Sequence, residues 1–329
     1  MALDLTEAVD IRGEAYEQVF TEIIAQADIV SSEHILLAQG IKGDEIISSI
    51  VTDPIIQAYS CTPTASGDID LVEVLSRPKL QEFYDKFCPT DLRYTRFQSK
   101  EGGAINSMDN EFTRIVAEDV LRRLHKKLET NFWGAISAAW QTSIAASALA
   151  APLQAWAAAA PNATTAAAGQ FNGIIAKLIW DGTAAVNSVK VSGTVLTTTN
   201  IIAEVNKVIA AIPSAVFSSP DGVRIFAPHA VKQLLTLVSA ALTNTNNAVV
   251  FNADGTVTYA GVTIVFTELP ANVMVAGVPQ MFMWLCDMES DMEYIHSERL
   301  SFPSKEWGLN ATWSMETHVN NATQAVLYL

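Results

Sequence analysis

Residues 109–134 carry the clearest helical periodicity in the chain. Their apolar members recur at intervals of three and four, on one face of a helix: Phe112, Val116, Val120, Leu121, Leu124, Leu128 and Phe132. Asp109 can cap the start of this helix. About 25 residues at about 1.5 Å each give a rod of roughly 40 Å. Such a rod is long for a compact domain, so the sequence predicts a spine around which other elements are arranged.

The segment before this helix divides into two parts. Residues 1–50 are expected to be helical and detached, because residues 11–30 carry an amphipathic stripe that needs cover from the same chain or from a neighbour. In residues 51–105, prolines recur among short β-prone runs at 55–59 and 69–75, and a turn-rich link joins the two runs. This pattern predicts a hairpin or extended arm, which would have too little core to be stable alone.

Residues 170–286 predict a layer of alternating helices and strands, of a size usual for one domain. The apolar helical patterns lie at residues 171–179, 200–212 and 230–241. Continuous apolar runs at 261–266 and 281–285 suit buried strands, and the turn Asn-Ala-Asp-Gly at 252–255 suits a hairpin. Residues 287–329 are strand-like and could pack with the long helix as a second, discontinuous domain. The expected fold class is therefore α+β.

Charged residues are missing between Glu129 and Lys177, and alanine is frequent there. A membrane-spanning helix needs about 20 strongly apolar residues in a row. Polar residues and prolines interrupt this run, as at Gln141 and Pro152, and most of its apolar residues are small. We expect a tightly packed helix followed by an Ala/Thr loop, and no membrane partner.

The charge balance argues against one class of function. The 329-residue chain has 20 Lys and Arg against 35 Asp and Glu, a formal net charge of −15. A surface whose main task is to grip nucleic acid needs an excess of cations. Half of the residues are hydrophobic and only 17% are charged, which indicates additional surface buried against something, most simply copies of the same chain.

The sequence contains none of the common catalytic or nucleotide-binding motifs. It has no GxxxxGK[ST], no GxGxxG after a strand, no HExxH and no GxSxG. Cys61, Cys88 and Cys286 form no CxxC motif, no cluster at zinc spacing and no even set for a disulfide framework, so we expect reduced, buried thiols. We assign no catalytic residue, no cofactor and no metal ligand, and we expect a structural protein rather than an enzyme.

An alternating acidic run follows the last apolar strand of residues 170–286. It consists of Asp287, Glu289, Asp291 and Glu293. Carboxylates at this density could hold Ca²⁺ or Mg²⁺. The run lacks the glycine and distal glutamate of an EF-hand, so a solvated loop or an acidic face between subunits is favoured.

The long helix carries a basic patch in its C-terminal half. The patch consists of Arg122, Arg123, Lys126 and Lys127. It could face nucleic acid or pair with acidic neighbours, and a solvated or ion-paired face is favoured. His229 follows Pro228 at a predicted helix start, which favours a capping or surface role. His296 lies near Glu293 and Glu298, where a solvated strand face is favoured.

Five sequence segments follow the two N-terminal parts, and their order and spacing are informative. They are the helix end Glu-Thr-Asn-Phe-Trp-Gly at 129–134, residues 174–182 ending Trp-Asp-Gly, the helix and strand within 206–228, the apolar strand at 281–288 and the closing strands at 311–329. In order and spacing they resemble the major capsid proteins of tailed bacteriophages, which have the Hong Kong 97-type fold. Residues 59–61 and 88–92 are similar to members from phages of Bacteroidota.

The resemblance implies five parts of the chain. These are an N-terminal arm at 1–50, an extended loop (E-loop, or β arm) at 51–105, a peripheral domain with the spine helix at 106–169, an axial α/β domain at 170–286 and C-terminal strands of the peripheral domain at 287–329. Many copies would assemble into pentamers and hexamers, which close as an icosahedral head shell around double-stranded DNA. Synthesis would take place in the host bacterial cytoplasm, and the product would be the virion capsid.

The resemblance also implies partners. They would be further copies of the chain and the portal, scaffolding or decoration proteins of the head, whereas packaged DNA would be contacted only non-specifically. Some members cross-link a lysine to an asparagine of a neighbour. Lys79 and Lys86 lie in the expected arm, but no motif identifies a partner asparagine, so this property is not carried over.

Two other classes of function remain open at this point. An encapsulin-type compartment would have the same fold and enclose a cargo enzyme instead of DNA. A monomeric α/β protein would hold a small ligand in a pocket within residues 170–286.

Overall fold

The computed structural model describes residues 34–41, 44–54, 67–87, 120, 123–124, 126–159, 171–219, 222–241, 249–287, 295–299 and 307–329. The predicted helix at 11–30 and the predicted strand at 55–59 lie outside these residues, as does the first part of the long helix. Residues 120, 123–124 and 126–134 are helical, so the described end of the long helix is confirmed.

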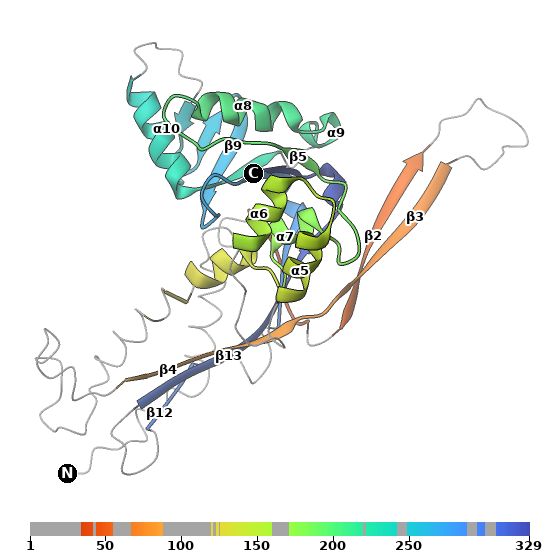
Figure 1. The fold of residues 1–329 in the computed structure, drawn as a ribbon, viewed down its shortest axis with the longest axis vertical. Helices are drawn as coiled ribbons and strands as arrows, with labels where there is room; N and C mark the ends of the chain where they lie inside the picture. The colour runs from red at the N-terminus through yellow and green to blue at the C-terminus, as the bar shows by residue number, and fades with distance from the viewer. Residues whose placement is uncertain are drawn as a thin grey trace, which may run out of the picture.

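A seven-stranded sheet forms the centre of one half of the molecule. Its strands, in spatial order, are β5 (Val189–Val191), β14 (Val326–Tyr328), β10 (Met274–Gly277), β6 (Arg224–Pro228), β9 (Val262–Thr267), β8 (Val257–Tyr259) and β7 (Val249–Phe251). Helices α8 (Ile201–Ala211) and α10 (His229–Ala241) cover one face, and the short helix α9 (Ser214–Phe217) follows α8 (Figure 1). The helices and the hairpin expected in this region are confirmed.

The central strands of this sheet are buried on both faces. In β6, Ile225 and Ala227 belong to the core under α8 and α10, whereas Phe226 between them belongs to a second core on the opposite face. The same alternation places Met274 and Val275 of β10 in different cores. Successive side chains of a strand point to opposite faces, so burial on both faces requires an unbroken apolar run. These strands accordingly appear as continuous apolar stretches in the sequence.

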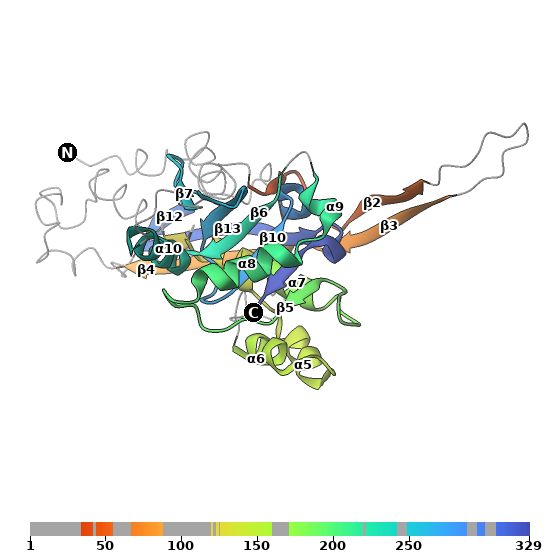
Figure 2. The ribbon, with the colours of Figure 1, turned by 90° about the horizontal axis from the view of Figure 1, so that it is seen from above.

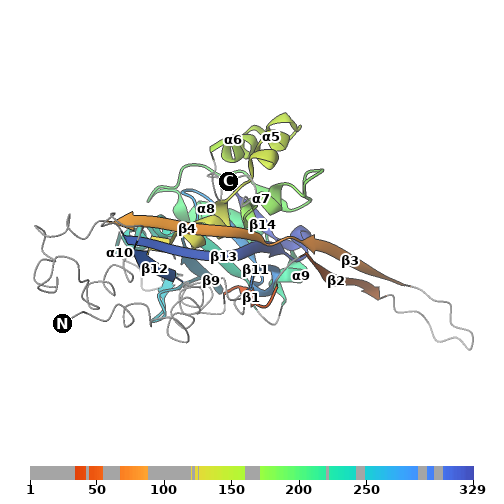
Figure 3. The ribbon, with the colours of Figure 1, turned by 90° about the horizontal axis from the view of Figure 1, so that it is seen from below.

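The second core lies against a five-stranded sheet organised around the long strand β13 (Trp307–Val319). β4 (Lys79–Phe87) pairs with one edge of β13, and β12 (Ile295–Arg299) and β11 (Phe282–Cys286) share the other edge. β1 (Leu36–Ala38) completes the sheet by parallel pairing with β11. Figure 3 shows β4 and β13 running side by side across the molecule.

Aromatic side chains join the two sheets at the end of the long helix. Trp133 is fully buried, and its ring centroid lies 4.9 Å from that of Phe226 in β6 and 6.0 Å from that of Phe282 in β11. The neighbouring Phe132 stacks on Trp284 of β11 at 4.9 Å. Buried aromatic side chains dominate the energetics of a core. This cluster therefore fixes the two sheets relative to each other.

The uncharged region after the long helix forms three short helices. α5 (Ala138–Ala146) and α6 (Ala151–Ala159) pack together and stand apart from the sheets in Figure 2, whereas α7 (Ile174–Ile179) packs against β13. Where the sequence predicts one helix, the described residues form two. The hydroxyl of Ser147 donates to the carbonyl of Ile144 at 2.6 Å and helps to end α5. Every helix in the described part of the chain is too short or too polar to cross a membrane.

β2 (Glu45–Pro54) and β3 (Gly67–Ser76) form a two-stranded sheet of their own, which projects from the body in Figures 1 and 2. β3 matches the predicted strand at 69–75. The prediction that residues 1–50 are helical is wrong for β1 and for the start of β2. β3 pairs with β2 along the whole length of the strand, and this partner is not visible in the local pattern.

The chain passes between the two sheets at points that differ from the expected domain boundaries. β4, expected in the arm, belongs to the five-stranded sheet, and α7 and β11, expected in the axial domain, pack in the core of that sheet. β14, expected with the peripheral strands, joins the seven-stranded sheet. Two short 3-10 helices mark these crossings: η4 (Pro279–Met281) leads from β10 to β11, and η5 (Ala322–Gln324) leads from β13 to β14.

Candidate assembly surface

One stretch of chain connects the projecting hairpin to the body. β3 ends at Ser76, and β4 begins at Lys79 after Arg77 and Pro78. Proline donates no N–H and restricts the residue before it, so the strand is interrupted at this point. β3 and β4 nevertheless run almost in line (Figure 3). β2, β3 and β4 are called the ribbon below.

The hairpin part of the ribbon exposes an apolar pair. Ile46 in β2 and Leu75 in β3 lie opposite each other in the register, and they are 57% and 47% exposed. The ion pair of Asp44 and Arg77, at 3.3 Å, is itself exposed and contributes little to stability. A two-stranded sheet is marginal on its own. The pair therefore offers apolar surface that a second molecule could cover.

β4 turns two large apolar side chains outward, and its inner face carries Gln81 beside Phe83. Leu80 and Tyr84 are 57% and 53% exposed, whereas Gln81 is buried. Leu80 and Tyr84 share one face of the strand because they are four residues apart. In the register they lie opposite Ser314 and Asn310 of β13. A sheet with one solvated face normally shows the reverse distribution.

Two buried polar atoms lie on β13, at the positions opposite Leu80 and Tyr84. Among the described residues, Oγ of Ser314 and Oδ1 of Asn310 have no hydrogen-bond partner. An unpaired buried polar atom costs about 1–3 kcal/mol. The ribbon also carries four of the ten large exposed hydrophobic side chains of the described residues. These features make the ribbon the main candidate for an assembly surface.

The basic patch of the long helix is partly ion-paired within the chain. Nζ of Lys126 lies 3.2 Å from Oε1 of Glu268, and the same oxygen lies 3.8 Å from Nε2 of His229. His229 is the first residue of α10, as the sequence predicts. Arg123 is exposed, and Arg122 lies outside the described residues. The described part of the patch therefore forms an ion-paired and solvated helix end.

The acidic run has one described member, Asp287, which is buried directly after β11. Within the described residues, no three His, Cys, Asp or Glu side chains gather as a metal site would require. Cys286 is buried, and its Sγ lies 3.8 Å from the carbonyl oxygen of Ala38, whereas the other two cysteines lie outside the described residues. His296 falls in β12, opposite Asn310.

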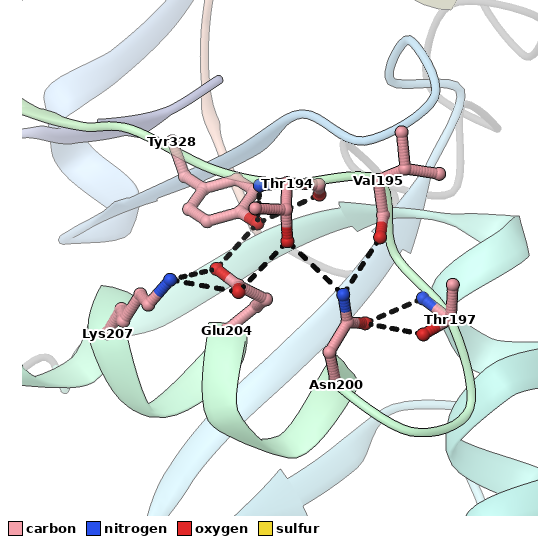
Figure 4. A network of polar contacts seen from close by, with 7 residues as sticks. All are labelled: Thr194, Val195, Thr197, Asn200, Glu204, Lys207 and Tyr328. Carbon is pink, nitrogen blue, oxygen red and sulfur yellow. Dashed lines mark hydrogen bonds and ion pairs between the residues drawn. The ribbon is translucent and has the colours of Figure 1, made fainter.

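A buried carboxylate on α8 holds the last strand in place, a feature that the sequence does not predict. The hydroxyl of Tyr328 donates to Oε2 of Glu204 at 2.9 Å, and Nζ of Lys207 lies 2.9 Å from both carboxylate oxygens (Figure 4). Oγ1 of Thr194 donates to Oε1 of Glu204 at 3.1 Å. The hydrogen bond from Lys207, with smaller contributions from Tyr328 and Thr194, holds the pKa of Glu204 below its usual range, although burial acts to raise it.

The loop that carries Thr194 passes close to the Tyr328 ring. The N–H of Gly193 donates to the carbonyl of Leu329 at 2.7 Å, and the N–H of Leu329 donates to the carbonyl of Val191 at 3.1 Å. A Cβ atom at position 193 would overlap the ring of Tyr328. Only glycine therefore allows this close approach of the loop to β14.

We expect Gly193→Ala to lower the free energy of unfolding by about 1–3 kcal/mol, because the Tyr328 ring must move and its hydrogen bonds must break. Equilibrium unfolding in urea measures this change. Ser192→Ala is the matched control, since Ser192 is exposed and should stay within about 0.5 kcal/mol of the original chain. Equal stability of the Gly193 variant and this control would contradict the packing described above.

No protein-family model matches the chain, and no curated protein matches its sequence. Solved structures match its fold. A capsid of a native GTA particle is 9% identical, with a TM-score of 0.52, 92% of this chain covered and 89% of that chain. A structure of Gordonia phage Cozz is 10% identical, with a TM-score of 0.55 and coverages of 92% and 85%. The satellite phage P4 procapsid is 10% identical, with a TM-score of 0.50 and coverages of 94% and 98%.

Likeness at this level of identity shows the fold. The chain has the α+β capsid fold, as its resemblance to phage major capsid proteins implied. The match covers 92% of this chain in both of these structures. The exposed apolar residues of the ribbon were not visible in the sequence, because leucine and tyrosine in a strand predict burial.

Proposed function

We propose that the protein is a major capsid protein. Many copies assemble into pentamers and hexamers, which close as an icosahedral head shell around the double-stranded DNA of a phage. The observation that carries this proposal is the ribbon, which exposes Ile46, Leu75, Leu80 and Tyr84 on a chain with the capsid fold. Large exposed apolar side chains gathered on one element mark an interaction site in a soluble protein.

Because the hairpin of the ribbon projects from the body, we expect it to contact a different surface on a neighbouring copy. A projecting hairpin is too far from most of its own chain to be covered by it, so its apolar pair needs a neighbour. Contacts between unlike surfaces produce closed rings when the rotation between neighbours closes. A protruding arm that is received by the next copy is such a contact, and it produces a ring when the rotation closes.

The proposal assigns each part of the chain a position in the shell. Residues 170–286 cluster as the axial domain around the centre of each ring, and residues 106–169 and 287–329 form the peripheral domain. Within residues 51–105, the expected E-loop, the hairpin lies across the neighbouring subunit, whereas β4 pairs with β13 of its own chain. Residues 1–50, as the N-terminal arm, tie capsomers together. β4 and β14, which cross the expected boundaries, connect these parts within one subunit.

The net negative charge of the chain is compatible with a shell that encloses DNA. A wall with a net charge of −15 per copy repels DNA phosphates, so it can enclose DNA with only non-specific contact. Its role is structural rather than catalytic, and its further partners are the portal, scaffolding and decoration proteins of the head. Synthesis takes place in the cytoplasm of the host bacterium, and the shell becomes part of the virion.

Light scattering of the purified full chain under assembly conditions tests this proposal. We expect particles whose mass corresponds to many copies, because the ribbon contact repeats around closed rings. A single-copy mass at every salt concentration and pH would contradict it and would favour a monomeric ligand-binding protein. Assembled shells that enclose an enzyme and no DNA when isolated from their native source would favour an encapsulin-type compartment.

A further inference from the structure

Residues 34–41 attach the N-terminal segment to the body through a short stretch of contacts. Ile35 and Ile41 are buried, and β1 between them is a three-residue strand at the edge of the five-stranded sheet. The N–H of Ile41 donates to the carbonyl of Cys286 at 3.3 Å. An edge strand this short gains little from its ladder, so other contacts of the stretch strongly affect whether it stays attached.

His34, at the start of this stretch, is buried against Arg224. Nη1 of Arg224 contacts Nδ1 of His34. The guanidinium group carries only donors and stays protonated, so Nδ1 of His34 must be the acceptor. The contact therefore requires a neutral imidazole with its proton on Nε2. Because Arg224 begins β6, it links the N-terminal stretch to the seven-stranded sheet.

Protonation of His34 would remove this acceptor and place two positive charges side by side. Burial, and then the charge of Arg224, lower the pKa of His34 from 6.5 to about 4. Asp254, in the turn between β7 and β8, acts in the opposite direction and only partly offsets them. These two side chains, from β6 and from the turn, are the charged groups acting on the ring among the described residues.

The sign of the pH effect follows from this lowered pKa. When residues 34–41 detach, His34 regains an ordinary pKa near 6.5, so the detached state binds a proton more readily than the attached state. The stabilisation is fully present above about pH 6.5 and is lost as the pH falls toward about 4. Acidification through this window therefore favours detachment.

We propose that His34 and Arg224 form a proton-sensitive latch that fastens the N-terminal segment to the body. With His34 neutral, residues 34–41 stay packed on β11 and β6. With His34 protonated, the stretch detaches while both cores stay folded. The latch lies within one chain, so it goes beyond the proposed assembly and does not depend on it.

Hydrogen exchange of the full chain tests the latch at about pH 7.5 and about pH 4.5, with exchange times scaled for the intrinsic effect of pH. We expect peptides covering residues 34–41 to lose about tenfold to a hundredfold protection at the lower pH, since the two pKa values differ by about two units. Peptides of β9, which carries no titratable side chain, should keep their protection. Equal protection of residues 34–41 at both pH values would overturn the proposal.

His34→Gln separates the latch from other effects of acid. The glutamine oxygen can accept from Arg224 at any pH, so this variant should keep residues 34–41 protected at about pH 4.5. Loss of protection equal to that of the original chain would overturn the proposal. Arg224→Gln is a second variant. Without the repelling charge the pKa of His34 in the attached state lies closer to 6.5, so the extra loss of protection at about pH 4.5 should become smaller. A pH-dependent loss as large as that of the original chain would count against the role of Arg224.

His318 provides the matched control. It is also buried, and burial followed by the charge of Lys177 lowers its pKa to about 4. It lies in β13 opposite Met283 of β11, whose other edge pairs with Leu36, so it is near the same stretch but makes no described contact with His34. His318→Gln should leave the pH-dependent loss at residues 34–41 intact. If His318→Gln abolished that loss, the latch would have to be assigned to His318 instead.

Discussion

Trp133→Ala is expected to lower the free energy of unfolding by about 3–5 kcal/mol, among the largest effects of a single substitution. The reason is the position of Trp133 between Phe226 of the seven-stranded sheet and Phe282 of the five-stranded sheet. Removal of its ring leaves a cavity where the two cores meet. Domains are stable by only about 5–15 kcal/mol, so this loss would also reduce the yield of folded protein.

Urea unfolding of unassembled subunits, followed by circular dichroism, measures this loss. Trp133→Phe should cost clearly less, because a ring remains and the buried indole Nε1 makes no hydrogen bond within the described chain. Trp156→Ala is the control on α6, where the side chain is only partly buried against the core. A cost below about 1 kcal/mol for Trp133→Ala would show that the aromatic cluster does not hold the sheets together.

Removal of the apolar pair on the hairpin is expected to abolish assembly and to leave the subunit folded. In the double variant Ile46→Lys with Leu75→Glu, opposite charges replace the exposed pair at facing positions, so the hairpin itself is supported. Each buried apolar side chain contributes about 1.5–3 kcal/mol to a contact. Loss of two side chains should weaken each contact between copies by a factor of about a hundred or more.

Sedimentation velocity distinguishes shells, capsomers and single subunits in this experiment. The matched control is Ile46→Val with Leu75→Ile, which keeps apolar, β-favouring side chains at both positions and should assemble. The urea midpoint of the charged variant should stay close to that of the original subunit, because both replaced side chains are exposed in it. Normal shell yield from the charged double variant would remove the ribbon from the assembly surface.

Local sequence patterns predict those elements whose apolar spacing or turn residues lie within the element itself. α8 and α10 follow from apolar residues at helical spacing, and the β7–β8 hairpin follows from its turn at residues 252–255. The ordered stretches that resemble phage capsid proteins also predict the fold as a whole. The basic patch and His229 were also placed correctly, on a helix end and at a helix start.

Long-range pairing is what the sequence leaves undetermined. β4 acquires its inner and outer faces only by pairing with β13, and the result buries Gln81 and exposes Leu80 and Tyr84. The inner face also carries Phe83, so hydrophobicity alone does not decide which side chains of β4 are buried. Such conflicts between local pattern and structure are expected where a surface is kept for a partner. The site of β14 beside β10 is equally invisible, because its three apolar residues carry no information about the sheet they join.

Electron microscopy of the purified full chain tests the central claim most directly. The account predicts closed, regular shells with rings of five and six subunits, and a hairpin that reaches from each subunit onto its neighbour. Particles of this kind should disappear in the Ile46→Lys, Leu75→Glu variant and persist in its apolar control. A uniform field of single subunits under conditions that assemble capsid proteins would contradict the account.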